Sequence, residues 1–247
     1  RHLDGRTIPA SLTRPASGPV RVHAGDPLGQ VVPWIASVTP EQRRYDHIHL
    51  EVVDWQGHFL NPNQFLPRPT DTLPPVIQQL WLLPNGSDNP FRVEEPEKLP
   101  VVHGTIDLVI DTYDQLDGSL YRHVPYEVTW KIEAASPTPP VEFPERVAYR
   151  FDRIPRADDR TVFADTFFQA RIKGEPTVIT CEGNNVGRRF LLHLAHGDVT
   201  SGYDAARGFD TRSLADGRYV LVVTVRDIDG NATSKRETFE VRQVGSR

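Results

Sequence analysis

Apolar and polar residues alternate along several stretches of this 247-residue chain, and this pattern limits the possible folds most strongly. The alternation is clearest in residues 106–110, 126–132 and 219–225, which are also rich in β-branched and aromatic residues. A period of two places the apolar side chains on one face of a strand, whereas an amphipathic helix needs a period near 3.6. These runs have the strand period, so we predict an all-β protein.

Proline clusters and turn signals predict two domains. Prolines gather at residues 67–69, 74–75 and 137–140, as in linkers and long loops. We place the domain boundary near residue 71, between the first two clusters. We expect one domain over residues 1–70 and a second over residues 73–245. In the second domain, short alternating strands indicate an immunoglobulin-like β-sandwich with a long insertion from about residue 141 to 208. Its role is open between a spacer for the first domain and a module that binds cell wall or protein.

The Asp229-Gly230 pair between two alternating runs predicts a hairpin. The acidic residues Asp227 and Asp229 also fit calcium, but the twelve-residue ligand loop of the helical calcium sites is absent. We therefore interpret both carboxylates as part of the turn.

Charge and composition exclude several classes of function. The formal net charge is −5, and lysine and arginine are scattered, which argues against a nucleic-acid partner. No apolar run approaches the ~20 residues that cross a bilayer, so no transmembrane segment is expected. The single cysteine, Cys181, cannot form an internal disulfide, and we interpret it as a buried, inert thiol. The chain begins without an initiator methionine, and we expect it to come from a longer protein.

The residues that most suggest metal binding or catalysis are His47, His49 and Glu51, which share one face if residues 45–53 form a strand. Two imidazoles would then lie side by side on a rigid support. A catalytic zinc ion takes three protein ligands and leaves a fourth position for water. A His-x-His pair by itself is equally typical of two exposed polar positions on a hairpin.

The flanking sequence favours the metal interpretation. Residues 20–31 read VRVHAGDPLGQV, residues 45–53 read YDHIHLEVV, and residues 54–66 read DWQGHFLNPNQFL. In order and spacing, residues 1–66 resemble the C-terminal half of the lysostaphin/LytM-type zinc endopeptidases, a partial antiparallel β-sheet domain. In that family a Tyr-x-His-Leu strand and a glycine turn precede the His-x-His strand, and a hairpin then leads to an Asn-Pro motif.

This resemblance implies a zinc metallopeptidase, secreted or periplasmic, that hydrolyses peptide cross-links of peptidoglycan with water activated by Zn²⁺. It assigns His49 as a metal ligand and His47 and His2 as catalytic residues. In the family the other two ligands come from a His-x-x-x-Asp motif N-terminal to the matched region, and no such spacing in this sequence offers a convincing substitute. An N-terminal companion segment or chain would then complete the site.

Two other classes of function stay open. One is a catalytically degenerate LytM-like scaffold that binds cell wall or a partner hydrolase. The other is an adhesive surface protein built of immunoglobulin-like modules, in which the N-terminal match is accidental. We interpret the remaining histidines as structural or solvated. In particular, the three-residue spacing of His193 and His196 at a strand end predicts rings on opposite faces.

Overall fold

The structure is a computed structural model of residues 1–247. It describes residues 2–3, 6–7, 21, 23, 25–26, 34–35, 44–45, 52–68, 70–91, 99–135, 143–154, 172–175, 190–197 and 207–243. The chain divides into two compact units, the N-terminal unit Arg1–Leu50 and the C-terminal unit Glu51–Arg247. The boundary expected near residue 71 falls inside the C-terminal unit, and the assignment of residues 1–70 to a peptidase domain stays a prediction.

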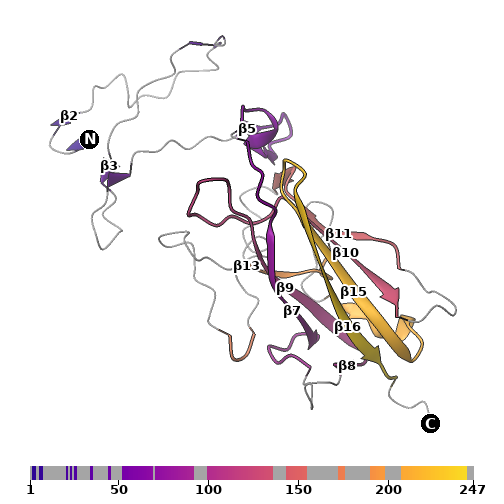
Figure 1. Ribbon diagram of the computed structural model, residues 1–247. Coiled ribbons are helices and arrows are strands. Elements are labelled where there is room, and N and C mark those ends of the chain that lie inside the picture. Colours follow the sequence, from indigo (N-terminus) through magenta and orange to yellow (C-terminus); the bar gives the residue numbers. More distant parts are fainter. Residues whose placement is uncertain are drawn as a thin grey trace. The chain divides into compact units, whose positions relative to one another are not determined.

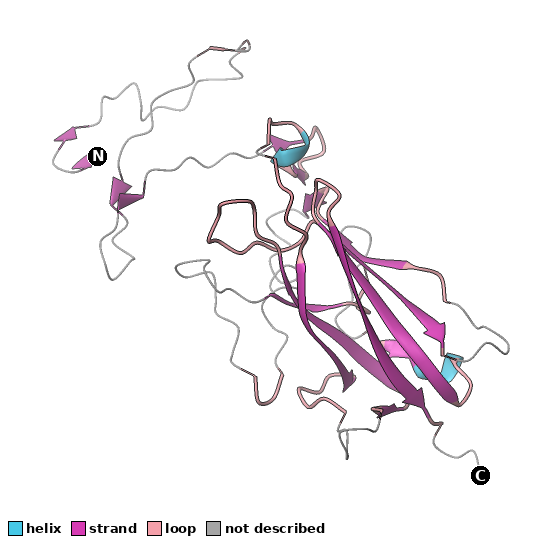
Figure 2. Ribbon diagram, in the orientation of Figure 1, coloured by secondary structure: helices cyan, strands magenta, loops and turns pink. Residues whose placement is uncertain are grey.

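The all-β prediction is confirmed. Strands dominate the described residues, and the only helical elements there are short 3₁₀ turns such as η2 (Pro62–Gln64) and η4 (Thr211–Ser213), drawn in cyan in Figure 2. No helix of the described part has the length and apolar character needed to span a membrane. In the N-terminal unit, β1 (His2–Leu3) pairs with β2 (Arg6–Thr7), and β3 (Trp34–Ile35) pairs with β4 (Arg44–Tyr45).

Two sheets form most of the C-terminal unit (Figure 1). The five-stranded sheet has the order β11 (Arg146–Arg150), β10 (Glu127–Ala134), β15 (Gly217–Arg226), β16 (Ala232–Val241) and β8 (Val101–Val102). In the second sheet, β9 (Thr105–Tyr113) pairs with β7 (Val76–Pro84), β13 (Phe190–His193) and β14 (Phe209–Asp210). All these pairs are antiparallel except β16 with β8.

The alternating sequences explain the packing of the two sheets. In β9, Ile106, Leu108 and Ile110 are fully buried in the main core. The same cluster receives side chains of β10 and β15, including Trp130 and Val223, so the two sheets share one core. Apolar burial of this kind contributes roughly 25 cal/mol per Å² and drives the layers together. The strands expected over 106–110, 126–132 and 219–225 are confirmed.

The long hairpin of β15 and β16, gold to yellow in Figure 1, turns at residues 227–231 as the Asp-Gly signal predicts. Asp227 Oδ1 accepts hydrogen bonds from the backbone N–H of Asp229 at 2.9 Å and of Asn231 at 2.8 Å. This carboxylate therefore stabilises the turn, in agreement with the prediction.

A smaller sheet of the C-terminal unit has the order β12 (Arg153–Ile154), β6 (Phe59–Leu60) and β5 (Val52–Val53). Asp54 closes the β5–β6 turn by accepting from the backbone N–H of Gln56 at 2.8 Å and of His58 at 2.9 Å. Asn61 then caps η2, and its Nδ2 donates to the carbonyl of Phe151 at 2.8 Å. These bonds hold residues 52–66 against residues 151–154.

Candidate metal centre

The sequence-predicted site residues lie mostly outside the described part of the structure. His47 and His49 belong to residues 46–50, which are not described. His2 lies in β1, where its backbone pairs with Thr7. The structure therefore neither brings these three histidines together nor separates them, and their roles stay predictions.

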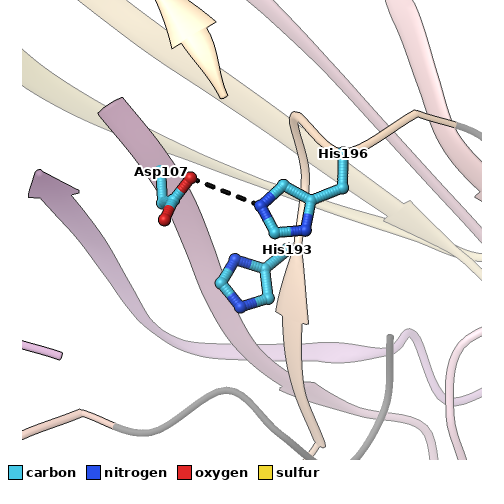
Figure 3. A group of neighbouring side chains, drawn as sticks. All are labelled: Asp107, His193 and His196. Atoms are coloured by element: carbon cyan, nitrogen blue, oxygen red, sulfur yellow. Dashed lines mark hydrogen bonds and ion pairs between the residues drawn. The ribbon is translucent and has the colours of Figure 1, made fainter. Parts of the chain in front are cut away.

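A different group, formed by Asp107, His193 and His196, has the donor atoms for a metal ion (Figure 3). One donor atom from each residue lies within 4.8 Å of the others. Asp107 and His196 are only 3% and 4% exposed, and His193 is half-buried. A buried Asp/His group able to hold a metal ion is thus present in the C-terminal unit.

The expectation that His193 and His196 point to opposite faces is wrong. Their rings stack with centroids 4.1 Å apart and planes inclined by 12°. The reason is that β13 ends at His193, and residues 194–196 form a bend. Alternation of faces holds only within a strand, so the bend returns His196 to the side of His193.

Asp107 reaches the site because β9 is buried on both faces. Its neighbours Ile106 and Leu108 point into the core between the sheets, so Asp107 points to the outer face of its sheet. A smaller apolar cluster packs in the same part of the fold, with Trp81, Leu83, Val109, Ile172 and Leu191. Leu83 pairs directly with Asp107, and Val109 pairs directly with His193, so these residues share the outer face.

The Asp107 carboxylate is the centre of a hydrogen-bond network. Oδ1 accepts from Asn85 Nδ2 at 2.9 Å and lies 3.3 Å from His196 Nε2, while Oδ2 accepts from the Gly86 N–H at 2.8 Å. Burial raises the pKa of Asp107, but the bonds from His196, Gly86 and Asn85 and the charge of His193 outweigh it. The pKa therefore lies below its usual value, and the group is a carboxylate.

His193 is held in its neutral form. Burial, followed by the nearby His196, lowers the pKa of His193 to about 4, against a smaller opposing effect of Asp107. Its Nδ1 atom is buried and has no hydrogen-bond partner. A neutral imidazole with a free nitrogen is the form that binds metals, and a buried nitrogen without a partner is costly unless a ligand satisfies it.

Two of the three donor atoms are already close enough to share one ion. Asp107 Oδ1 and His196 Nε2 lie 3.3 Å apart. His193 differs, because the nitrogens of two stacked, nearly parallel rings do not converge on one point. Its ring has to rotate about its own side-chain bonds to become the third ligand.

The sequence carries a signal for this group at Asp107. Asp107 interrupts the apolar run of residues 106–110, and a carboxylate on a strand covered on both faces needs buried partners. The partners themselves lie 21 to 89 residues away along the chain. Comparison with known proteins adds nothing here, because no family model, no curated protein and no solved structure matches the chain.

Proposed function

We propose that this chain is part of a zinc metallopeptidase that cleaves peptide cross-links of peptidoglycan. The observation that carries the proposal is the ordered series of motifs across residues 1–66, centred on His47-x-His49. In this proposal His49 binds zinc, and His47 and His2 act on the substrate and on the proton transfers. An N-terminal segment or a second chain supplies the remaining ligands.

The described residues next to the motif support this proposal. The family pattern continues from the His-x-His strand through a hairpin to an Asn-Pro motif. Residues 52–60 form an antiparallel hairpin, and Asn61-Pro62 follows it directly. Because Asn61 caps η2 and binds the carbonyl of Phe151, this motif has a structural role, fixing the end of the hairpin.

The chemistry follows from the residue types. Zinc, when bound, supplies the Lewis acidity that activates water and polarises the peptide carbonyl. If residues 47–51 continue the strand into β5, His47 and His49 share a face because they are two residues apart. The second imidazole is then close enough to exchange a proton or to stabilise charge that develops on the substrate.

The test is zinc content and activity of the full-length protein purified without added metal, with peptidoglycan peptides as the substrate. We expect His49→Ala to lose one equivalent of zinc and all measurable hydrolysis. The matched control is His23→Ala, because His23 is exposed and bonds to Asp26 three residues away. Unchanged zinc content and activity in His49→Ala would refute the peptidase proposal, and absence of hydrolysis in the wild type would favour the degenerate wall-binding scaffold.

We further propose that zinc is the ion held by Asp107, His193 and His196. Nitrogen and carboxylate donors suit zinc, and two of them are already close enough to share one ion. In this proposal the site is structural and joins β9 to the bend that follows β13. His193→Ala is expected to remove a separate equivalent of zinc while hydrolysis is retained. Undiminished zinc in this variant would refute the assignment.

A further inference from the structure

Three buried aspartates meet in the C-terminal unit, well separated along the chain. Asp71 precedes β7, Asp114 directly follows β9, and Asp227 directly follows β15. They are 5%, 7% and 4% exposed, and one carboxylate oxygen from each lies within 4.8 Å of the others. Burying three like charges together is unfavourable unless a cation or protons neutralise them.

Hydrogen bonds fix these carboxylates in place, and Asp114 Oδ1 accepts from the backbone N–H of Gln115 at 2.9 Å. Asp227 Oδ2 accepts from Asn231 Nδ2 at 2.6 Å, and the same Nδ2 donates to the backbone carbonyl of Asp71 at 2.9 Å. Asp71 Oδ1 accepts from the N–H groups of Leu73 and Asp117 at 3.2 and 3.3 Å. The cluster is therefore organised by the hairpin turn and by the segment that leads into β7.

The second oxygen of Asp71 is available to a ligand. Asp71 Oδ2 is buried and has no hydrogen-bond partner, although the residue is only 5% exposed. A charged oxygen in this position is among the most unfavourable groups to leave unsatisfied. Since Oδ1 already accepts two backbone N–H groups, Oδ2 is the oxygen left for a ligand shared with Asp114 and Asp227.

No basic side chain of the described residues neutralises the cluster. Arg68 contacts the β15–β16 turn, but it pairs with Asp229 at 3.0 Å. Burial raises the pKa of Asp114 to about 7, and the charges of Asp227, Asp71 and Asp229 add to this rise. The three carboxylates thus repel one another in the absence of a cation.

We propose that Asp71, Asp114 and Asp227 form a binding site for one calcium ion. Oxygen-only ligands select a hard cation such as Ca²⁺ or Mg²⁺ over zinc. Mg²⁺ usually keeps several waters and binds through one or two carboxylates, whereas Ca²⁺ takes more protein oxygens in a flexible geometry. Three protein carboxylates at one position therefore favour Ca²⁺.

The bound ion would join three parts of the chain. It ties the segment before β7 to the end of β9 and to the β15–β16 turn. Since β9 and β15 belong to different sheets, the ion links both sheets of the C-terminal unit. It also anchors the segment before β7, which contains Asp71. This inference is independent of the proposed peptidase activity and of the Asp107 site.

Isothermal titration of the full chain with CaCl₂, after removal of metals with a chelator, tests the proposal. We expect one site per chain with a dissociation constant tighter than about 10⁻³ M, and a melting temperature that rises with calcium. Asp114→Asn is the diagnostic variant, because it removes a ligand charge and also relieves the repulsion, so folding is retained. Its calcium affinity is expected to fall by at least about tenfold.

Two controls separate this site from other sources of binding. Asp229→Asn removes a neighbouring charge that pairs with Arg68, and it is expected to keep the calcium response. His193→Ala, at the other candidate site, is also expected to keep it. The proposal is overturned if wild-type protein shows no calcium binding tighter than about 10⁻³ M, or if Asp114→Asn and Asp229→Asn lose binding equally. A larger stabilisation by magnesium than by calcium would overturn the choice of ion.

Discussion

Removal of the Asp107 carboxylate is the sharpest test of the network at the candidate metal centre. We expect Asp107→Ala to lower the free energy of unfolding by about 3–5 kcal/mol in the presence of a chelator. The His196 imidazole is only 4% exposed, so loss of its bond to a carboxylate costs about 1–3 kcal/mol. Asn85 and Gly86 are exposed and can bind water instead, so their two lost bonds cost about 1 kcal/mol each.

The assay is urea denaturation of the full chain, monitored by tryptophan fluorescence, with the free energy extrapolated to water. Asp88→Ala is the matched control, since Asp88 lies in the same loop but is exposed. Its effect is expected to stay within about 0.5 kcal/mol. A loss below about 1 kcal/mol for Asp107→Ala would refute the argument, because the buried His196 imidazole would then have lost its acceptor at no cost.

Three further predictions concern packing and pH. Leu192 is fully buried in the shared core, so Leu192→Ala is expected to cost about 2–5 kcal/mol, and little or no cost in the same denaturation assay would contradict the packing described. Gly208→Ala is expected to lower the free energy of unfolding by about 1–3 kcal/mol, because a Cβ there would lie 2.7 Å from the carbonyl oxygen of Ile106; an unchanged melting temperature would refute this. Burial raises the pKa of Glu237 above 4.5 against the opposing charge of Lys235, so the folded state holds this proton more tightly than the unfolded state does. The stabilising contribution of the proton is present below pH 4.5 and is lost as the pH rises through the folded-state value. Glu237→Gln should therefore gain stability relative to wild type between acidic and neutral pH, and a constant difference across that range would argue against a raised pKa.

The main strands could be predicted because their signal is local. Alternation in residues 106–110 and 219–225 and the Asp229-Gly230 turn each depend on neighbours within about ten residues. The structure extends these runs to β9 and β15 and pairs β15 with β16 through the expected turn. The His47-x-His49 motif is a local signal of the same kind, and its role stays a prediction that the zinc measurement tests.

The two buried clusters could not be found in this way. The alternation rule gave the wrong faces for His193 and His196 because β13 ends at the first of them and the chain bends before the second. Asp227 was correctly predicted as a turn residue, but its proximity to Asp71 and Asp114 depends on contacts between segments more than 40 residues apart.

The sequence by itself determined the all-β class, the core-facing residues of the long strands and the hairpin turn, because each follows from the period of side chains along an extended backbone. Only the tertiary structure decided which polar residues meet. Packing of two sheets buries Asp107 beside His193 and His196 and gathers three aspartates at a second position. Such groupings depend on strand order and on where each strand ends, and no local pattern in the sequence specifies either.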